Sequence, residues 1–519
     1  MHHMKTRRSK RFGDDGESRK KILLVAPKHP ESFWSMQGMV DMLGKRTLMP
    51  NSALATLVAL TPGGVNVEYF LMDENVSEID LDFECDLVAI TGSTLHTTRV
   101  RDLVSEFRQR GKLVALGGAY ATLEADRCEG LADFHFIGEA EHTWPKFLEE
   151  WQRGEADEVY TQESFIDLGD SPAPDWSLVD EGDYLNFPVQ TSRGCPNGCE
   201  FCDVIQYVGR KYRTKSADQI LEEISGAQAA GAQRVFFSDD NFLGNKRFTM
   251  ELLRRLLQWN RVQEKPLSFS TQITVKVGDD DELLKLMADV RFSVLFLGVE
   301  TVRKACLEEI NKPINLSNDM HERIRRITRY GIVPFIGLIV GFDNDDATVF
   351  DDLRDFLDET GSPIVGISLL NAPRHTPLHE RLKKEGRLRE DGFSGEWQLN
   401  TNIIPKQMSR EELFTRYWSF FKECYDPVVF ERRLHSWMAQ VEYFAVPYEG
   451  KSADLWEALK GIKVFWRLMT KDGKDVRKLF LRCMKKTWKG TPRLMGWLFV
   501  ILIQYSHFYS FVNKDRGHA

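Results

Sequence analysis

The sequence lacks a long hydrophobic run, an excess of basic residues and a dense set of cysteines. Its longest uninterrupted apolar stretch, 494–503, is about half of the roughly 20 residues that a membrane-spanning helix requires, so we expect no transmembrane segment. A net charge of −8 and a pI near 5.9 argue against a protein that binds nucleic acid. Residues 1–20 are polar and contain no apolar core, so we expect a disordered tail there, no secretory signal and a cytoplasmic location.

The composition is that of a large globular protein. With 519 residues, 42% of them hydrophobic and 28% charged, the chain is long enough for about three domains. Five of its cysteines occur singly, as reduced thiols usually do. They are Cys85, Cys128, Cys306, Cys424 and Cys483. This distribution predicts no disulfide framework.

The other three cysteines, Cys195, Cys199 and Cys202, follow a strand-like run in a C-x3-C-x2-C spacing. Thiolates are the natural ligands of iron–sulfur clusters, and a cubane cluster takes four. Three ligands in one loop can hold three irons and leave the fourth open to a small molecule. Gly194 and Gly198 allow the loop to wrap tightly. Zinc would need a fourth ligand, which does not follow close by, and disulfide pairing would leave one cysteine over.

Short apolar strands alternate with helical patterns over 21–153. The predicted strands are 21–26, 66–72, 86–92, 112–117 and 133–137, and the predicted helices are 51–60, 97–109 and 141–151. This alternation indicates a Rossmann-like, doubly wound parallel sheet, which binds ligands at the carboxyl ends of its strands. The small and polar residues at those ends are Thr91, Ser93, Thr94, Gly117, Gly118, Gly138 and Glu139.

A second α/β unit is predicted over 187–395, after a polar linker at 154–186. Its strands are 187–190, 234–238, 267–274, 294–299, 333–340 and 365–370, with helical stretches between them. Six such units indicate a partial (β/α)6 barrel whose chemistry lies at the carboxyl ends of the strands. Arg210, Lys211 and Arg213 follow the cysteine loop and either steer an anion or form a solvated basic loop.

The remaining region, 396–519, is predicted to be helical. Residues 457–493 hold many more lysines and arginines than acidic residues, interleaved with Trp466, Phe480 and Trp488. We favour a helical cap whose apolar face packs on the barrel. Peripheral contact with an anionic membrane is the second interpretation.

The cysteine loop resembles the signature of the radical SAM superfamily, with Arg193 and Gly194 before it and Phe201 before its last cysteine. The resemblance implies a [4Fe–4S] cluster on the three cysteines and S-adenosylmethionine (SAM) on the open iron. It also implies an electron donor such as flavodoxin or ferredoxin, and cleavage of SAM to a 5′-deoxyadenosyl radical. The residues that it places around SAM are Ser238, Asp239, Asp240, Asn241, Gln272, Gly298, Glu300, Gly337 and Gly341.

An α/β domain with these turns, placed before such a core, resembles the cobalamin-binding domain of cobalamin-dependent radical SAM proteins. The resemblance implies that cobalamin contacts the strand-end residues named above. The motif Asp-x-His-x-x-Gly, whose histidine ligates cobalt, is absent, and neither His29 nor His96 matches its spacing. We therefore expect base-off cobalamin without a protein imidazole, or a domain that binds no cobalamin.

Segments 369–382, 384–387 and 408–412 extend the resemblance to the subgroup related to the hopanoid C-2 methylase. This implies a methyltransferase acting on an unactivated carbon of a lipid or other small molecule. The alternatives are a radical SAM cyclase or rearrangement enzyme in which cobalamin is accessory or absent, and a non-catalytic cofactor-binding sensor. No general acid or base can be singled out. His375 stands where this subgroup commonly has glycine.

Overall fold

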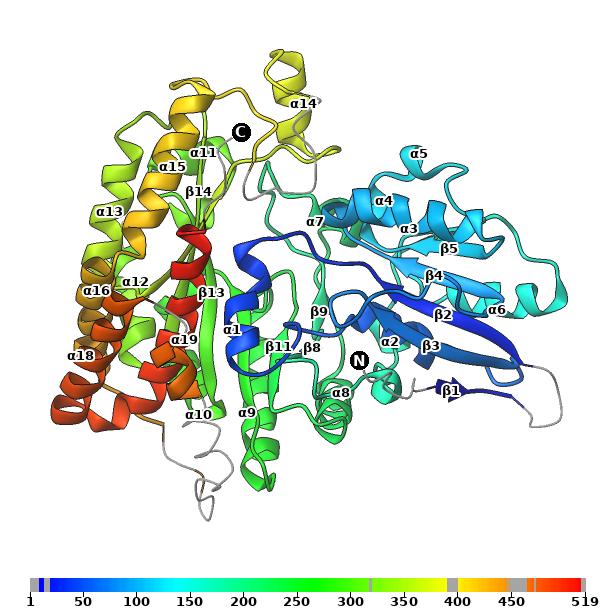
Figure 1. Cartoon of the computed structure of the whole chain (residues 1–519), viewed down its shortest axis with the longest axis horizontal. Coiled ribbons are helices and arrows are strands. Elements are labelled where there is room, and N and C mark those ends of the chain that lie inside the picture. Colours follow the sequence, from blue (N-terminus) through cyan, green and yellow to red (C-terminus); the bar gives the residue numbers. More distant parts are fainter. Residues whose placement is uncertain are drawn as a thin grey trace.

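The computed structural model describes residues 9–13, 19–316, 320–389, 400–445, 448, 464–470 and 473–514. Two mainly parallel sheets lie side by side, and a group of helices covers the second sheet on the side away from the first (Figure 1). The α/β class expected from the sequence is therefore correct.

The first sheet has the order β1-β3-β2-β4-β5-β6-β7, and all its strand pairs are parallel except β1 with β3. Its strands are β1 (Ser9–Arg11), β2 (Lys20–Ala26), β3 (Val67–Asp73), β4 (Leu87–Thr91), β5 (Leu113–Gly117), β6 (Phe134–Ile137) and β7 (Val159–Thr161). The helices between them include α2 (Ser52–Ala59), α3 (Thr97–Gln109), α4 (Ala119–Leu123), α5 (Ala125–Cys128) and α6 (Thr143–Arg153).

Two of the expected boundaries were wrong. Strand β1 lies inside the expected tail 1–20, and β7 lies inside the expected linker 154–186, where each adds an edge strand to the sheet. Both strands are three residues long and largely exposed, so neither has the apolar pattern that marks a strand in a sequence. Backbone pairing and the Arg11–Glu68 ion pair, at 2.7 Å, hold β1 in place.

The central strands are apolar throughout because helices cover both faces of the sheet. In β2, Ile22 and Leu24 pack in one core with α2 and α6, whereas Leu23 and Val25 pack in another with α3. This is the burial expected of a doubly wound parallel sheet, in which continuous apolar runs replace alternation. The strand order changes direction beside β2, between β3 and β4, and in sheets of this kind such a change opens a crevice at the carboxyl ends of the strands.

The second sheet contains all six predicted strands in sequence order, and every pair is parallel. They are β8 (Phe187–Val189), β11 (Arg234–Phe237), β12 (Ser268–Ile273), β13 (Phe292–Glu300), β14 (Val333–Val340) and β15 (Ile364–Leu369). The connecting helices include α8 (Ala217–Ala229), α9 (Lys246–Val262), α10 (Asp281–Val290), α12 (Met320–Arg329) and α13 (Val349–Thr360).

A segment from the N-terminal part of the chain packs on this second sheet. The turn Phe33–Ser35 and helix α1 (Gln37–Met42) lie against α19 (Met495–Val512), where His507 Nε2 donates to Phe33 O at 2.8 Å. Trp34 stacks on Phe335 of β14, with 5.5 Å between ring centroids. The expected unit 21–153 therefore does not pack as one continuous body.

The C-terminal region is helical where it is described. It contains α15 (Arg410–Cys424), α16 (Pro427–Gln440), α18 (Lys474–Gly490) and α19, while residues 457–463 and 471–472 of the basic region lie outside the described residues. By length and composition, Pro492–Val512 could cross a membrane, with a mean hydropathy of 1.3, but 61% of that window is buried inside the fold. Phe508, for example, stacks on Tyr425 at 4.8 Å. This packing favours the expected helical cap.

Candidate functional site

The three clustered cysteines lie in the loop that follows β8, at the carboxyl end of the second sheet. The short strands β9 (Ser192–Arg193) and β10 (Arg213–Thr214) pair across the base of this loop, and helix α7 (Val204–Val208) follows it. At Gly194, φ is +95°, and an added Cβ would lie 2.2 Å from the carbonyl oxygen of Lys211, so only glycine fits.

All three cysteines are free thiols, and none is exposed. Burial, followed by the nearby Asp203 carboxylate, raises the pKa of Cys202 to about 12. Iron binding therefore has to drive the release of its proton. Three thiols in one protected loop match the donor set that a cubane cluster with one open iron requires.

Two neighbouring carboxylates at the end of β11 hold the loop in place. Asp239 is fully buried and accepts hydrogen bonds from Thr191 N at 2.7 Å, Ser192 N at 2.9 Å and Thr191 Oγ1 at 2.5 Å. Asp240 accepts from Gly194 N at 2.8 Å. The family resemblance implied that both residues surround SAM. In the structure, both carboxylate oxygens of Asp239 instead accept hydrogen bonds from Thr191 and Ser192, just before the cysteine loop.

The Gly298–Glu300 turn at the end of β13 contains a buried ion pair. Lys312 bonds the Glu300 carboxylate and donates to Gly298 O at 2.9 Å, and both side chains are largely buried. Glu300 has φ of +66°, next to a register shift in the pairing of β13 with β14. The Lys312 ammonium also acts electrostatically on Cys199, which places a positive charge beside the cysteine loop.

The other residues predicted around SAM make hydrogen bonds or packing contacts within the protein. Gln272 Nε2 donates to the backbone oxygen of Asp239 at 2.6 Å, which ties the end of β12 to that of β11. An added Cβ at Gly337 would lie 2.6 Å from Phe296, so glycine is needed there for packing. Gly341 N donates to Asp345 at 2.9 Å in a buried turn. Asn241 is buried, and its side chain accepts from Leu243 N at 3.3 Å.

A cavity of about 340 Å³ lies between the carboxyl ends of the two sheets. Thr91, Gly117, Gly118, Gly138 and Glu139 of the first sheet line one side. Their contact with cobalamin stays a prediction. The second half contributes Gln190, Arg193, Tyr207, Ser238 and Asp240. The apolar part of the lining is contributed by Leu54, Leu57, Ala89, Ala115, Phe136 and Trp144.

The glycines of this cavity are required by close backbone approach. An added Cβ at Gly118, where φ is +89°, would lie 2.4 Å from Thr91 Oγ1, and at Gly138 it would meet Gln162 at the same distance. Ser93 and Thr94 do not line the cavity; Ser93 instead bonds His96 Nδ1 through its backbone N–H at 3.1 Å. The backbone itself therefore forms part of the cavity wall at Gly118 and Gly138.

Ion pairs join the two halves beside this cavity. Arg193 bonds Glu139 at 3.0 Å and Glu141 at 2.6 Å, and Arg213 bonds Glu139 at 2.8 Å. Glu139, predicted as a cobalamin contact, is thus held by two guanidinium groups. Arg213, expected either to steer an anion or to be solvated, does neither. The sequence does not reveal this pairing because its partners are 52 to 74 residues apart.

His29 and His96, neither of which matches the spacing of the cobalt-ligating motif, bond each other. Because Ser93 N–H donates to His96 Nδ1, the remaining His96 proton sits on Nε2 and points to His29 Nδ1 at 2.8 Å. Burial and the neighbouring His29 lower the pKa of His96 to about 4, so this pair is uncharged at neutral pH. Neither histidine lines the cavity.

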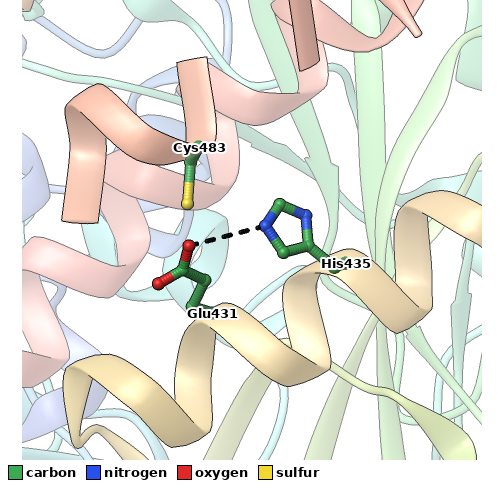
Figure 2. Close-up of side chains that lie close together, drawn as sticks. All are labelled: Glu431, His435 and Cys483. Atoms are coloured by element: carbon green, nitrogen blue, oxygen red, sulfur yellow. Dashed lines mark ion pairs between the residues drawn. The ribbon is translucent and has the colours of Figure 1, made fainter. Parts of the chain in front are cut away.

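The described residues contain another group of metal-ligand side chains, shown in Figure 2: Glu431 and His435 of α16 with Cys483 of α18. Their ligand atoms lie within 4.8 Å of one another. However, Arg482 donates to Glu431 Oε2 at 2.6 Å and 3.0 Å, so the carboxylate is already neutralised and a guanidinium occupies its free side. This arrangement is an ion pair between two helices, and we assign no metal to it.

Comparison with known proteins identifies the family of the chain. Residues 189–357 match the radical SAM superfamily, and residues 376–518 match a domain of unknown function, DUF4070. An uncharacterized methyltransferase of Synechocystis sp. is 35% identical over 78% of this chain and 76% of its own. The hopanoid C-2 methylase of Rhodopseudomonas palustris is 30% identical over 73% of each chain.

The fold has a solved counterpart in the radical SAM methyltransferase TsrM from Kitasatospora setae, with a TM-score of 0.62 and 14% identity. The match covers 90% of this chain and all of that one, whose structure holds cobalamin and a [4Fe–4S] cluster. The fold and the cysteine loop define a radical SAM enzyme. More closely, the chain belongs to the radical SAM methyltransferase family that includes the hopanoid C-2 methylase, as its sequence led us to expect.

Proposed function

We propose that this protein is a cobalamin-dependent radical SAM methyltransferase that methylates an unactivated carbon of a lipid or other small molecule. The observation that carries the proposal is the cavity shared by the two sheets. Its walls combine the glycine turns of the first sheet with Ser238 and Asp240 beside the cysteine loop of the second. Groups bound at the two strand ends would therefore face the same enclosed space.

The residues present fit three cofactors. Cys195, Cys199 and Cys202 would hold the [4Fe–4S] cluster, the turns at Gly298–Glu300 and Ser238–Asp240 would hold SAM, and the glycine turns of the first sheet would hold cobalamin. When bound, the cluster and SAM supply a radical that removes a hydrogen atom from the substrate, and cobalamin supplies the methyl group. The protein's part is binding, orientation and exclusion of water.

This chain's own residues orient and enclose the site. Asp239 and Asp240 fix the cysteine loop to the end of β11, and Lys312 fixes the Glu300 carboxylate. Arg193 and Glu141 close the gap between the halves with a buried, charge-assisted bond. Such a rigid and water-poor site protects a radical from side reactions.

The partners follow from this chemistry. The reaction needs an apolar or amphipathic small molecule as substrate and an external one-electron donor such as flavodoxin or ferredoxin. The partial (β/α)6 barrel inferred from the six sequential parallel strands supports the same active-site position, at the carboxyl ends of the strands. A cytoplasmic location is part of the proposal, because free cysteines persist in a reducing compartment.

The test uses protein purified and reconstituted without oxygen, with cobalamin, dithionite and SAM. Iron and cobalt are quantified, and 5′-deoxyadenosine and S-adenosylhomocysteine are followed by mass spectrometry. Bound cobalt with both products, in the presence of a lipid extract as the substrate source, supports methyl transfer. Deoxyadenosine without cobalt or S-adenosylhomocysteine would instead favour the cyclase or rearrangement reaction.

A matched pair of cysteine variants tests the cluster ligands. Cys199→Ala should abolish cluster assembly and both products. Cys85→Ala, a half-buried free thiol on the first sheet's side, should leave iron content and products unchanged. Equal iron content in the two variants would refute the assignment of the cluster.

A further inference from the structure

Helix α18 presents an outward face that is unlike the rest of the protein. Its inward positions, Val476, Leu479, Phe480, Cys483 and Thr487, are buried. We call the outward positions the basic face, which consists of Lys474, Arg477, Lys478, Leu481, Lys485, Lys486, Trp488 and Lys489. The spacing of three and four residues places them along one side of the helix.

Charge on this face opposes that of the whole chain. Residues 473–493 contain eight lysines and arginines against one aspartate, which is a formal charge of +7. Since the chain carries −8 in total, everything else carries −15. Arg482 pairs with Glu431, and Lys478 lies 3.6 Å from the exposed Asp475. All the lysines of the basic face are exposed to solvent. A local basic cluster of this kind in an acidic protein creates a positive field that favours a strongly anionic partner.

Two large apolar side chains stand within the charged face. Trp488 is 70% exposed and Leu481 is 49% exposed. Beyond the end of the helix, Arg493 lies over the ring of Phe444, which is itself 37% exposed, at 5.8 Å. Tryptophan and lysine together are typical of the interface between lipid headgroups and water, where the indole enters the headgroup layer and the ammonium groups meet phosphates.

The position of α18 argues against the acidic electron donor as occupant. In Figure 1, α18 lies at the outer edge of the molecule, beyond the second sheet, whereas α7 and the cysteine loop lie between the two sheets. An electron donor has to approach the cysteine loop, so a docking face at the far edge would not serve it.

We propose that the basic face of α18 docks the protein on an anionic phospholipid surface. The lysines and arginines provide the electrostatic attraction, and Trp488 with Leu481 inserts between headgroups. Each basic residue near such a surface contributes about 1 kcal/mol, so removing one should weaken binding about fivefold. The inference goes beyond the proposed function, because it holds whatever the substrate is.

The test is sedimentation of the reconstituted holoenzyme with sucrose-loaded vesicles, either pure phosphatidylcholine or with one quarter phosphatidylglycerol. We expect binding only to the anionic vesicles, weakening as salt rises. The double variant Lys485→Glu with Lys489→Glu should lose more than tenfold in binding. A control with the same charge change at Lys146 and Lys304, which are 61% and 76% exposed, should bind like the wild type.

Cleavage of SAM with dithionite checks that each variant is folded and active, and should not differ among them. Equal binding to both vesicle types, or equal loss in the control variant, would overturn the proposal. Two other outcomes would also overturn it. If the α18 variant bound vesicles normally but lost the SAM cleavage that reduced flavodoxin supports, the face would be a docking site for the electron donor. If the wild type bound a DNA duplex more tightly than vesicles at equal salt, the face would be a nucleic-acid site.

Discussion

Lys312 pairs with Glu300 beside the cysteine loop, a role that the sequence did not predict. It lies in a segment without any recognisable motif, yet its ammonium holds Glu300, caps Gly298 O and faces Cys199. A buried carboxylate at the cofactor site needs such a partner, since an unpaired buried charge costs several kcal/mol. Lys312 therefore sets both the orientation of Glu300 and the positive potential at the cysteine loop.

Replacing Lys312 with methionine should make the cluster harder to reduce and slow SAM cleavage by about 10- to 100-fold, the usual effect of losing an outer-shell partner. The measurements are a redox titration followed by electron paramagnetic resonance, and the yield of 5′-deoxyadenosine. Lys312→Arg, which keeps the charge, should restore most of the potential. An unchanged potential in Lys312→Met would show that the lysine is only structural.

Asp239 should make stability depend on pH. Burial raises its pKa from 3.8 to about 7, with the neighbouring Asp240 contributing in the same direction. Between these two values the folded protein holds a proton that the unfolded chain releases, so this contribution to stability is full below the lower value and is lost as pH rises through 7. Relative to Asp239→Asn, the wild-type melting temperature should therefore fall as pH rises from about 4 to about 7 and level off above that. A constant difference would contradict the burial argument.

Residue identity was predictable from sequence where local spacing carries the information. The three cysteines and the strand-end glycines required no long-range knowledge. Gly118 and Gly138 were chosen as small residues at strand ends, and the structure adds that both have positive φ. His375 is similar: its φ of +66° explains why glycine is common at this position. Pairings between distant segments, such as Glu139 with Arg213, have no local signature.

At the level of elements, the cysteine loop depends on one left-handed glycine. Gly194→Ala would drive its Cβ to within 2.2 Å of Lys211 O at an unfavourable φ, so the hairpin of β9 and β10 has to open. We expect iron content after reconstitution to fall to less than half of the wild-type value. The control is Gly226→Ala in α8, where the added methyl meets nothing within 4 Å and should stabilise by about 0.5–1 kcal/mol. Full iron loading of Gly194→Ala would exclude this account.

Buried strands were predicted from the sequence, whereas exposed edge strands were missed. All six strands of the second sheet and the five inner strands of the first were found, because a buried parallel strand is a continuous apolar run. The edge strands β1 and β7 are mostly exposed and carry no such run. From sequence, the segment of α19 was judged too short to span a membrane because its uninterrupted apolar run is short. In the structure the buried part of the helix also includes polar residues such as Gln504 and His507, which only tertiary contacts can reveal.

For the whole molecule, the decisive feature is how the two sheets are held together. Arg193 and Arg213 bridge them beside the cavity, and a second bridge comes from Arg374, which follows β15. Its guanidinium bonds Glu124 and Asp126, at the ends of α4 and α5, at 2.8 Å each. These contacts tie the carboxyl ends of the two sheets together, a property that no single segment of the sequence encodes.

Breaking the Arg374 bridge should weaken cobalamin binding without destroying the fold. With Arg374→Met the two sheets sample wider separations, so the fraction of molecules with a closed cavity falls and the apparent affinity falls with it, by about 3- to 10-fold. Arg303→Met is the matched control, because Arg303 also bonds two carboxylates, at 2.7 Å and 3.0 Å, but within the second half alone. Cobalamin titration by absorbance should show a loss of affinity for Arg374→Met only, with the iron content of both variants unchanged. Equal affinities in the two variants would mean that the bridge at Arg193 and Arg213 suffices to close the cavity.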